Sequence, residues 1–144
     1  MIVVADTSGL LAMFNRSDPE HFAVRRAADS ASALVVSPLA LTEVHHVASV
    51  RAGRKVADRI LGLLAERIAS TRVVLAQVDA TQLATAISVR GTYDGLDLHL
   101  VDAVCVALGA EYDTDAILTL DRDFRVLRPL NGYPAFRLFP DDCE

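Results

Sequence analysis

Cysteine and long hydrophobic runs are both scarce in this sequence, and each shortage excludes a class of protein. The two cysteines, Cys105 and Cys143, form no C-x-x-C pair and show no Cys/His spacing of a zinc site. We therefore expect two free thiols in a reducing compartment, the cytoplasm. No apolar run reaches the roughly 18 residues of a membrane span, so no membrane contact is expected. The N-terminal segment has no basic region and reaches Asp6 too early for a signal peptide.

Positive charge is also in short supply. The chain has 14 Lys and Arg against 19 Asp and Glu, which gives a formal net charge of −5. Broad adhesion to nucleic acid needs a basic surface and is therefore not expected. A nuclease is still compatible with this balance, because an acidic metal site can lie among local basic patches. Every basic residue except Lys55 is an arginine, the residue that suits bidentate phosphate contacts.

What the sequence does contain is enough apolar material for one domain. Hydrophobic residues make up 52% of 144, and no linker, repeat or low-complexity segment interrupts them. Short apolar segments predict strands at 1–6, 33–37, 72–78 and 116–120, and an edge strand at 135–140. Amphipathic or capped segments predict helices at 7–15, 17–31, 38–53, 54–70, 79–91 and 98–110, and a helical turn at 121–127. This alternation predicts an α/β fold with a mostly parallel sheet of four or five strands and helices on both faces.

One helix of this fold poses a chemical problem. Residues 98–110 are apolar around nearly the whole helix, which predicts burial, yet Asp102 lies among them. Aspartate is rarely buried without a partner, because an unpaired buried carboxylate either raises the free energy of the folded state or takes up a proton. Asp102 therefore needs a hydrogen-bond donor, a basic side chain or a metal ion.

Three further acids are expected to approach Asp102. Asp6 and Asp121 directly follow two predicted strands, and the carboxyl ends of parallel strands meet at one edge of a sheet. Glu43 lies in the second turn of the helix that follows a third strand. Each acid has an ordinary interpretation, as a helix cap or a solvated side chain. Together, however, converging carboxylates repel one another unless a hard cation such as Mg²⁺ or Mn²⁺ intervenes.

Smaller polar side chains near these acids are candidates for a supporting role. Thr7, Ser8 and Thr119 can orient a water molecule or a carboxylate. Their ordinary interpretations are helix capping for Thr7 and Ser8, and strand propensity for Thr119. Asp97 lies five residues before Asp102, about 140° round a helix, and is interpreted as an N-cap or loop acid. No motif or spacing in the sequence assigns a role to His99.

Four segments, "VVADTSGLLAMF", "VVSPLALTEV", "VDAVCVALGA" and "ILTLDRDF", occur in this order. In that order and spacing they resemble the PIN-domain ribonucleases, specifically the VapC-type toxins of bacterial toxin–antitoxin pairs. The resemblance covers nearly the whole chain and implies a compact α/β/α PIN domain over 1–140, followed by a frayed C-terminal tail, 141–144. It also implies Mg²⁺- or Mn²⁺-dependent cleavage of RNA, leaving a 5′-phosphate and a 3′-hydroxyl, and a cognate antitoxin that blocks the site.

The resemblance also assigns residues. The four acids of the family fall on Asp6, Glu43, Asp102 and Asp121, so none of the core acids is missing. Asp123 matches a position that is frequently acidic and whose role varies. Family members commonly pair, so we expect a homodimer, with a seam along helix 22–31 or helix 59–68.

Two groups of basic residues are candidates for contacts with RNA phosphates. The preferred group, near the predicted site, is Arg122, Arg125 and Arg128. The second group is the densest basic stretch, Arg51, Arg54, Lys55 and Arg59. Its ordinary interpretation is a solvated face with ion pairs, for example to Asp58 and Glu66.

The leading hypothesis is a metal-dependent endoribonuclease toxin that cleaves tRNA, rRNA or mRNA. One alternative is a non-catalytic PIN-like module that binds RNA or protein, which the intact set of acids argues against. A second is a receiver-like phosphoryl-transfer domain, which needs a lysine after a late strand; Lys55 comes far too early. A HAD-type phosphatase needs D-x-D after the first strand, and "ADTSG" does not provide it.

Overall fold

The computed structural model describes residues 1–142, and within them one sheet holds five strands. They are β1 (Ile2–Ala5), β2 (Ala33–Val36), β3 (Val73–Leu75), β4 (Ala116–Leu118) and β5 (Arg137–Phe139). The strands lie in the order β3-β2-β1-β4-β5, and every neighbouring pair is parallel. The predicted parallel sheet, including its edge strand, is confirmed.

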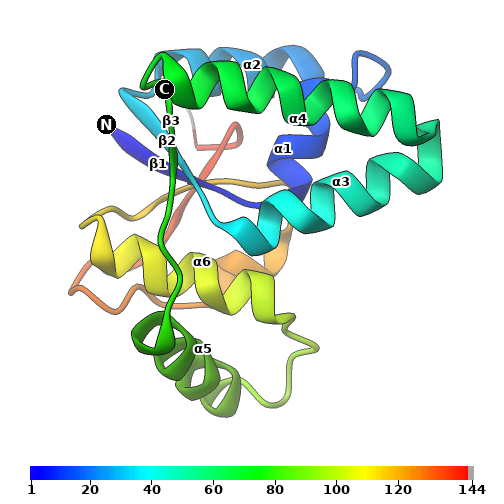
Figure 1. Ribbon diagram of the computed structural model, residues 1–144. Coiled ribbons are helices and arrows are strands. Elements are labelled where there is room, and N and C mark those ends of the chain that lie inside the picture. Colours follow the sequence, from blue (N-terminus) through cyan, green and yellow to red (C-terminus); the bar gives the residue numbers. More distant parts are fainter. Residues whose placement is uncertain (143–144) are drawn as a thin grey trace.

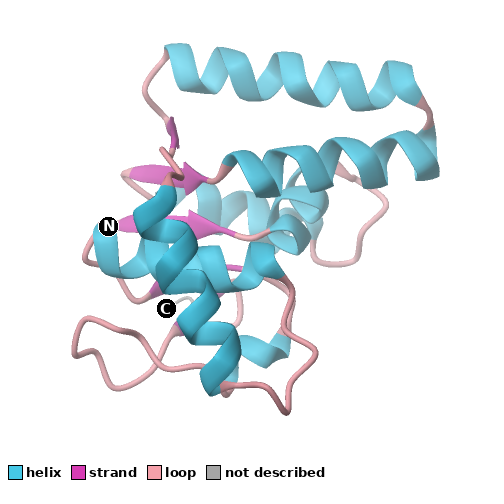
Figure 2. Ribbon diagram, turned by 60° about the horizontal axis from the view of Figure 1, so that its bottom comes forward, coloured by secondary structure: helices cyan, strands magenta, loops and turns pink. Residues whose placement is uncertain are grey.

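Helices cover both faces of this sheet, as Figures 1 and 2 show. They are α1 (Thr7–Phe14), α2 (His21–Ser30), α3 (Pro38–Ala52), α4 (Arg54–Ala69), α5 (Ala80–Thr92), α6 (Leu100–Glu111) and the 3₁₀ helix η1 (Arg122–Arg125). Alternate side chains of a strand point to opposite faces. Val3 and Ala5 accordingly pack into the core beneath α1–α4, whereas Val4 packs into the core beneath α5 and α6. The predicted α/β/α architecture is therefore confirmed.

Capping side chains set the starts of α3 and α5. Ser37 accepts a hydrogen bond from the Ala40 N–H at the start of α3, and Asp79 caps α5. The expected start of α2 near residue 17 is wrong. Asp18 instead accepts a hydrogen bond from the Glu20 N–H in a tight turn, so the helix begins only at His21.

The strand order creates a crevice at the centre of the sheet. The chain moves outward from β1 to β3 and then returns to place β4 on the other side of β1. Ligands in open parallel sheets bind outside the carboxyl ends of strands at such a reversal. The Asp6 N–H donates to the Leu118 carbonyl at 3.0 Å, which joins the end of β1 to the end of β4. The fold therefore brings the residues after these two strands together.

The C-terminal segment is held more firmly than expected as far as it is described. The Asp142 N–H donates to the Leu138 carbonyl, and its carboxylate accepts from the Leu138 N–H and from Arg125. The prediction of a frayed tail is therefore wrong for Asp142.

Residues 143–144, including the thiol predicted to be free at Cys143, lie outside the described residues. Cys105 is buried and unpaired, and no helix within 1–142 is long and apolar enough to span a membrane.

Candidate active site

Asp6 is a buried carboxylate held by two hydroxyl groups. It directly follows β1 and is only 3% exposed. Its Oδ2 atom accepts hydrogen bonds from Thr119 Oγ1 at 2.8 Å and from Ser8 Oγ at 3.0 Å. Asp6 occupies the N-cap position of α1, where Thr7 or Ser8 was expected, but its side chain makes no capping hydrogen bond. Helix capping therefore does not explain this carboxylate.

The same two hydroxyls tie Asp6 to the chain after β4. Thr119 Oγ1 accepts from the Asp121 N–H, and Ser8 Oγ accepts from the Leu120 N–H, both at 2.9 Å. Asp121 Oδ1 accepts a hydrogen bond from the Asp123 N–H at 2.9 Å and so caps η1. The ordinary interpretation of this acid as a helix cap is therefore confirmed. The other oxygen of Asp121 has no bonding partner within residues 1–142. Capping therefore uses half of this carboxylate and leaves the other half free to bind a ligand.

Asp102 lies near the start of α6, where its Oδ2 atom accepts from the His99 N–H at 3.2 Å. Partial burial and the charge of Asp6 raise the pKa of Asp102 to about 7, the charge of Asp121 adds to the increase, and the His99 hydrogen bond opposes it. Burial likewise raises the pKa of Asp6, against the hydrogen bond from Thr119. The acids are thus close enough to raise one another's pKa.

One cleft of about 450 Å³ brings the predicted acids together. Its carboxylates are Asp6, Glu43, Asp97, Asp102, Asp121 and Asp123. Thr7 and Ser8 also line it, whereas Thr119 bonds to Asp6 without lining the cleft. Glu43 is half-buried and makes no hydrogen bond or ion pair within the described chain. Acids from four separate elements therefore share one cleft.

The interpretation of Asp97 as a loop acid is confirmed, but the helix angle that separated it from Asp102 is wrong, and sequence reasoning missed two other cleft residues. Asp97 precedes α6, so the angle calculated for a helix does not apply to it, and it lines the cleft. His99 is the N-cap of α6 and lines the cleft as well. Arg51 follows Glu43 by eight residues on α3, a spacing that places both on one helix face. That spacing was the available signal for Arg51.

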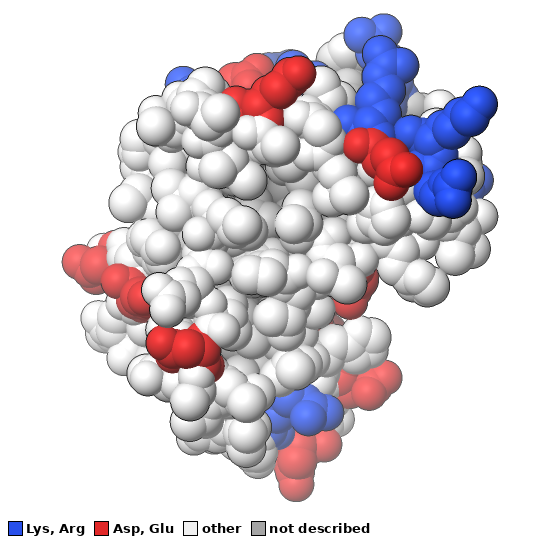
Figure 3. All heavy atoms as spheres, in the orientation of Figure 1, with Lys and Arg blue, Asp and Glu red and all other residues white. Residues whose placement is uncertain are grey.

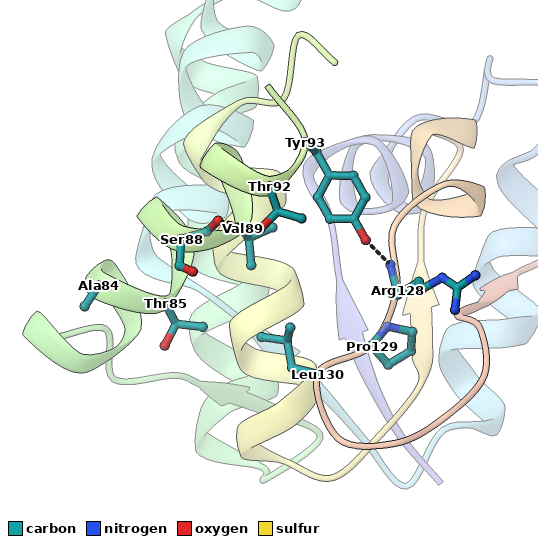
Figure 4. Close-up of a pocket in the computed structure, with 9 residues that line it drawn as sticks. All are labelled: Ala84, Thr85, Ser88, Val89, Thr92, Tyr93, Arg128, Pro129 and Leu130. Atoms are coloured by element: carbon teal, nitrogen blue, oxygen red, sulfur yellow. Dashed lines mark hydrogen bonds between the residues drawn. The ribbon is translucent and has the colours of Figure 1, made fainter. Parts of the chain in front are cut away.

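The preferred arginines do not line the cleft. Arg125 makes paired hydrogen bonds of 2.6 and 2.9 Å to Asp142, and the side chain of Arg122 lies 3.7 Å from Asp141. Arg128 lines a separate cavity beside α5, where its backbone N–H donates to the Tyr93 hydroxyl (Figure 4). Of these three candidates, Arg125 is bound most firmly to a carboxylate of its own chain. The arginine that does line the acidic cleft is Arg51, from the second group of basic residues.

The cleft residues fit a hard divalent cation. Carboxylates supply oxygen atoms, which Mg²⁺ and Mn²⁺ prefer. Thr7 Oγ1 is buried in the cleft wall and has no partner among the described residues. Within 1–142, however, no three acidic, His or Cys side chains form a ready-made metal cage. This arrangement fits an ion that keeps several waters and contacts only one or two carboxylates directly, as Mg²⁺ usually does.

The raised pKa of Asp102 predicts how the stability of the metal-free protein depends on pH. The carboxyl group keeps its proton in the folded state up to about pH 7, whereas its ordinary pKa is 3.8. The resulting stabilisation is fully present below pH 3.8 and is lost as the pH rises through about 7. Because the group is partly exposed, we expect a loss of about 2 kcal/mol in the free energy of unfolding.

Urea unfolding in EDTA, measured from about pH 5 to pH 8, tests this prediction. Asp102→Asn should reduce the decline, the remainder coming from Asp6, whose pKa burial also raises, and Asp94→Asn, which changes an exposed loop acid, should preserve the full decline. The prediction is wrong if the Asp102→Asn variant and the unchanged chain lose stability in parallel.

The geometry agrees with three comparisons to known proteins. A family model described as PIN domain matches residues 3–128. Ribonuclease VapC26 of Mycobacterium tuberculosis is 38% identical over 132 residues, which cover 90% of this chain and 95% of that protein.

Two solved structures share the fold. M. tuberculosis VapC20, described as a sarcin–ricin loop cleaving toxin, aligns with a TM-score of 0.75 and 24% identity over 93% of this chain and 100% of that one. VapBC2 from Rickettsia felis, bound to a DNA fragment from its promoter, aligns with a TM-score of 0.66 and 15% identity over 96% and 97% of the two chains.

Proposed function

Because the chain belongs to the PIN domain family, and within it to the VapC ribonucleases, we propose that it is a metal-dependent endoribonuclease toxin. The observation that carries this proposal is the cleft in which Asp6, Glu43, Asp102 and Asp121 meet from four different elements. The motif-based assignment to the family is confirmed. A non-catalytic PIN-like module is a weaker alternative, because such a module has no need of four convergent carboxylates.

The proposed metal ligands are Asp6, Glu43, Asp102 and Asp121, directly or through water. Bound there, Mg²⁺ or Mn²⁺ supplies Lewis-acid polarisation of a phosphodiester and offsets the charge of the carboxylates. Thr119 and Ser8 fix the Asp6 carboxylate through their two hydrogen bonds.

Two further groups of the cleft support this site without a change of protonation. The Asp123 N–H holds one oxygen of Asp121, so the second oxygen faces its ligands in a defined direction. Thr7 Oγ1, which is buried in the cleft wall, has a hydroxyl hydrogen to donate to a bound water. In the reaction of the family, water adds to phosphorus and the bond to O3′ breaks, which leaves a 5′-phosphate and a 3′-hydroxyl.

A cleavage assay tests the proposal. The purified chain is mixed with total cellular RNA, tRNA, and an oligonucleotide of the sarcin–ricin loop, the target named for VapC20. We expect new ends carrying a 5′-phosphate in Mg²⁺ or Mn²⁺ and none in EDTA. Absence of cleavage of every RNA, by protein shown to bind Mn²⁺, would support the non-catalytic module instead.

The partners and location belong to the same proposal. An antitoxin that covers the acidic cleft would block access of RNA, and action on cellular RNA places the toxin in the cytoplasm. A homodimer through α2 or α4 has some support, because Phe22 on α2 is 71% exposed and Leu63 on α4 is 39% exposed. Apolar side chains exposed to this degree are suited to burial against a second copy.

A further inference from the structure

A basic patch outside the acidic cleft has no role in the reaction described above. It consists of Arg51, Arg54, Lys55 and Arg59, all of them exposed, where α3 turns into α4. Figure 3 shows Lys and Arg side chains concentrated at this end of the molecule, at the upper right. We name these four residues the α3–α4 basic patch.

Ion pairing does not account for the patch. Within residues 1–142, none of its four side chains lies in a salt bridge. Asp58, which was expected to pair with them, instead binds His45 Nε2 at 2.9 Å. The four side chains are solvated, as the sequence suggested, but the ion pairs expected to Asp58 and Glu66 are not present within residues 1–142.

Helix stability accounts for Arg51, which lies in the last turn of α3, where the helix dipole favours positive charge, but it does not account for Arg54 and Lys55. Arg54 and Lys55 are the first two residues of α4, where the helix dipole disfavours positive charge. The first turn of α4 has no acid, and its N-cap, Gly53, offers no side chain. Residues that break a local rule without compensation in the fold are expected at functional sites.

Arg51 connects the patch to the acidic cleft. Glu43, Val47 and Arg51 follow one another at four-residue spacing on α3, and all three line the cleft. Among residues 1–142, Arg51 is the only Lys or Arg that lines it. Glu43 and Arg51 are separated by about 12 Å along the helix axis, so Arg51 lies beyond the acids, at the rim. Arg54 and Lys55 follow Arg51 across the turn into α4, and Arg59 lies in the second turn of α4, where it lines a different cavity.

We propose that the α3–α4 basic patch is a phosphate-binding track that holds the RNA strand where it leaves the acidic cleft. The proposal rests on the proposed ribonuclease function. An acidic cleft in a protein of net charge −5 repels RNA, so the strand needs a cationic contact near the acids. Residues 51–59 include no aromatic side chain on which bases could stack, so the contact is to phosphates and independent of base sequence.

Salt-dependent RNA binding tests the track. Binding of a single-stranded RNA oligonucleotide is measured in EDTA, where cleavage is not expected, between about 0.05 and 0.2 M salt. Arg51→Gln should flatten the slope of log affinity against log salt by about 0.7, the value for one phosphate contact on a single strand. The combined variant Arg54→Gln, Lys55→Gln, Arg59→Gln should flatten it further. Both effects should be the same for oligonucleotides of different sequence.

Arg67→Gln is the matched control, because it removes the same charge from the opposite end of α4, about 20 Å from Arg54. Arg67 likewise lies in no salt bridge within the described chain, and its variant should keep the slope of the unchanged chain. Circular dichroism of every variant checks that the fold is retained.

Three results would overturn the phosphate-binding track, and each points to a different explanation. Unchanged slopes in both patch variants, with RNA cleavage by the unchanged chain intact, refute the track alone. Binding of polyglutamate, a model acidic polypeptide, is measured for the same variants. If the patch variants lose this binding while the slope of log RNA affinity against log salt is unchanged, the patch is a surface for an acidic protein. A chain that neither binds nor cleaves any RNA overturns the track together with the proposed function.

Discussion

Asp6→Asn is expected to lower the rate of RNA cleavage on the order of 10³-fold without loosening the fold. Asparagine preserves the shape of the side chain and keeps an oxygen that can accept from Thr119 and Ser8, but it removes the negative charge. Because burial already disfavours the charged form of Asp6 and raises its pKa, a neutral side chain there should leave the metal-free protein at least as stable.

The combination of lost activity and retained stability distinguishes a functional carboxylate from a structural one. Single-turnover cleavage in Mn²⁺ gives the first quantity, and urea unfolding in EDTA gives the second. Mn²⁺ binding should weaken in the same variant. Asp94→Asn removes an equal charge from an exposed loop outside the cleft and should change none of the three. An Asp6→Asn variant that cleaves RNA at the full rate would remove Asp6 from the site.

Gly9→Ala is expected to destabilise the protein by about 3 kcal/mol, or to prevent folding. Gly9 lies in α1 where the helix crosses the end of β4. A Cβ atom there would collide with the Leu118 carbonyl oxygen and would lie 2.7 Å from the carbonyl carbon. Backbone cannot rotate away as a side chain can, so α1 would have to move. That movement would displace Asp6 and Ser8 from Thr119 and so reduce activity as well.

Gly62→Ala is the matched control, since Gly62 also lies inside a helix but has no atom within 4 Å of the added Cβ. We expect it to stabilise the protein by up to about 1 kcal/mol through helix propensity. Thermal or urea unfolding of both variants checks the pair. Equal stability of the two variants would mean that the close approach of α1 to β4 does not constrain the fold.

The sequence by itself determined the layers of the fold and the edge at which the acids meet. Apolar segments at 1–6 and 116–120 predicted strands, which the structure contains as the shorter strands Ile2–Ala5 and Ala116–Leu118, and parallel strands end at a common edge. Asp6 and Asp121 follow these strands, so their convergence needed no knowledge of side-chain packing. Asp102 was identified because a carboxylate in an apolar helix requires a partner.

Only the tertiary structure decided which neighbours complete the site. Arg125 is near the acids in sequence, but Asp142 reaches it across the fold and binds its guanidinium. Arg51 is far from Asp121 in sequence, yet α3 carries it to the cleft rim. Periodicity and strand ends are local properties that a sequence displays directly. Pairings between distant residues depend on how loops and helices pack, which no local pattern specifies.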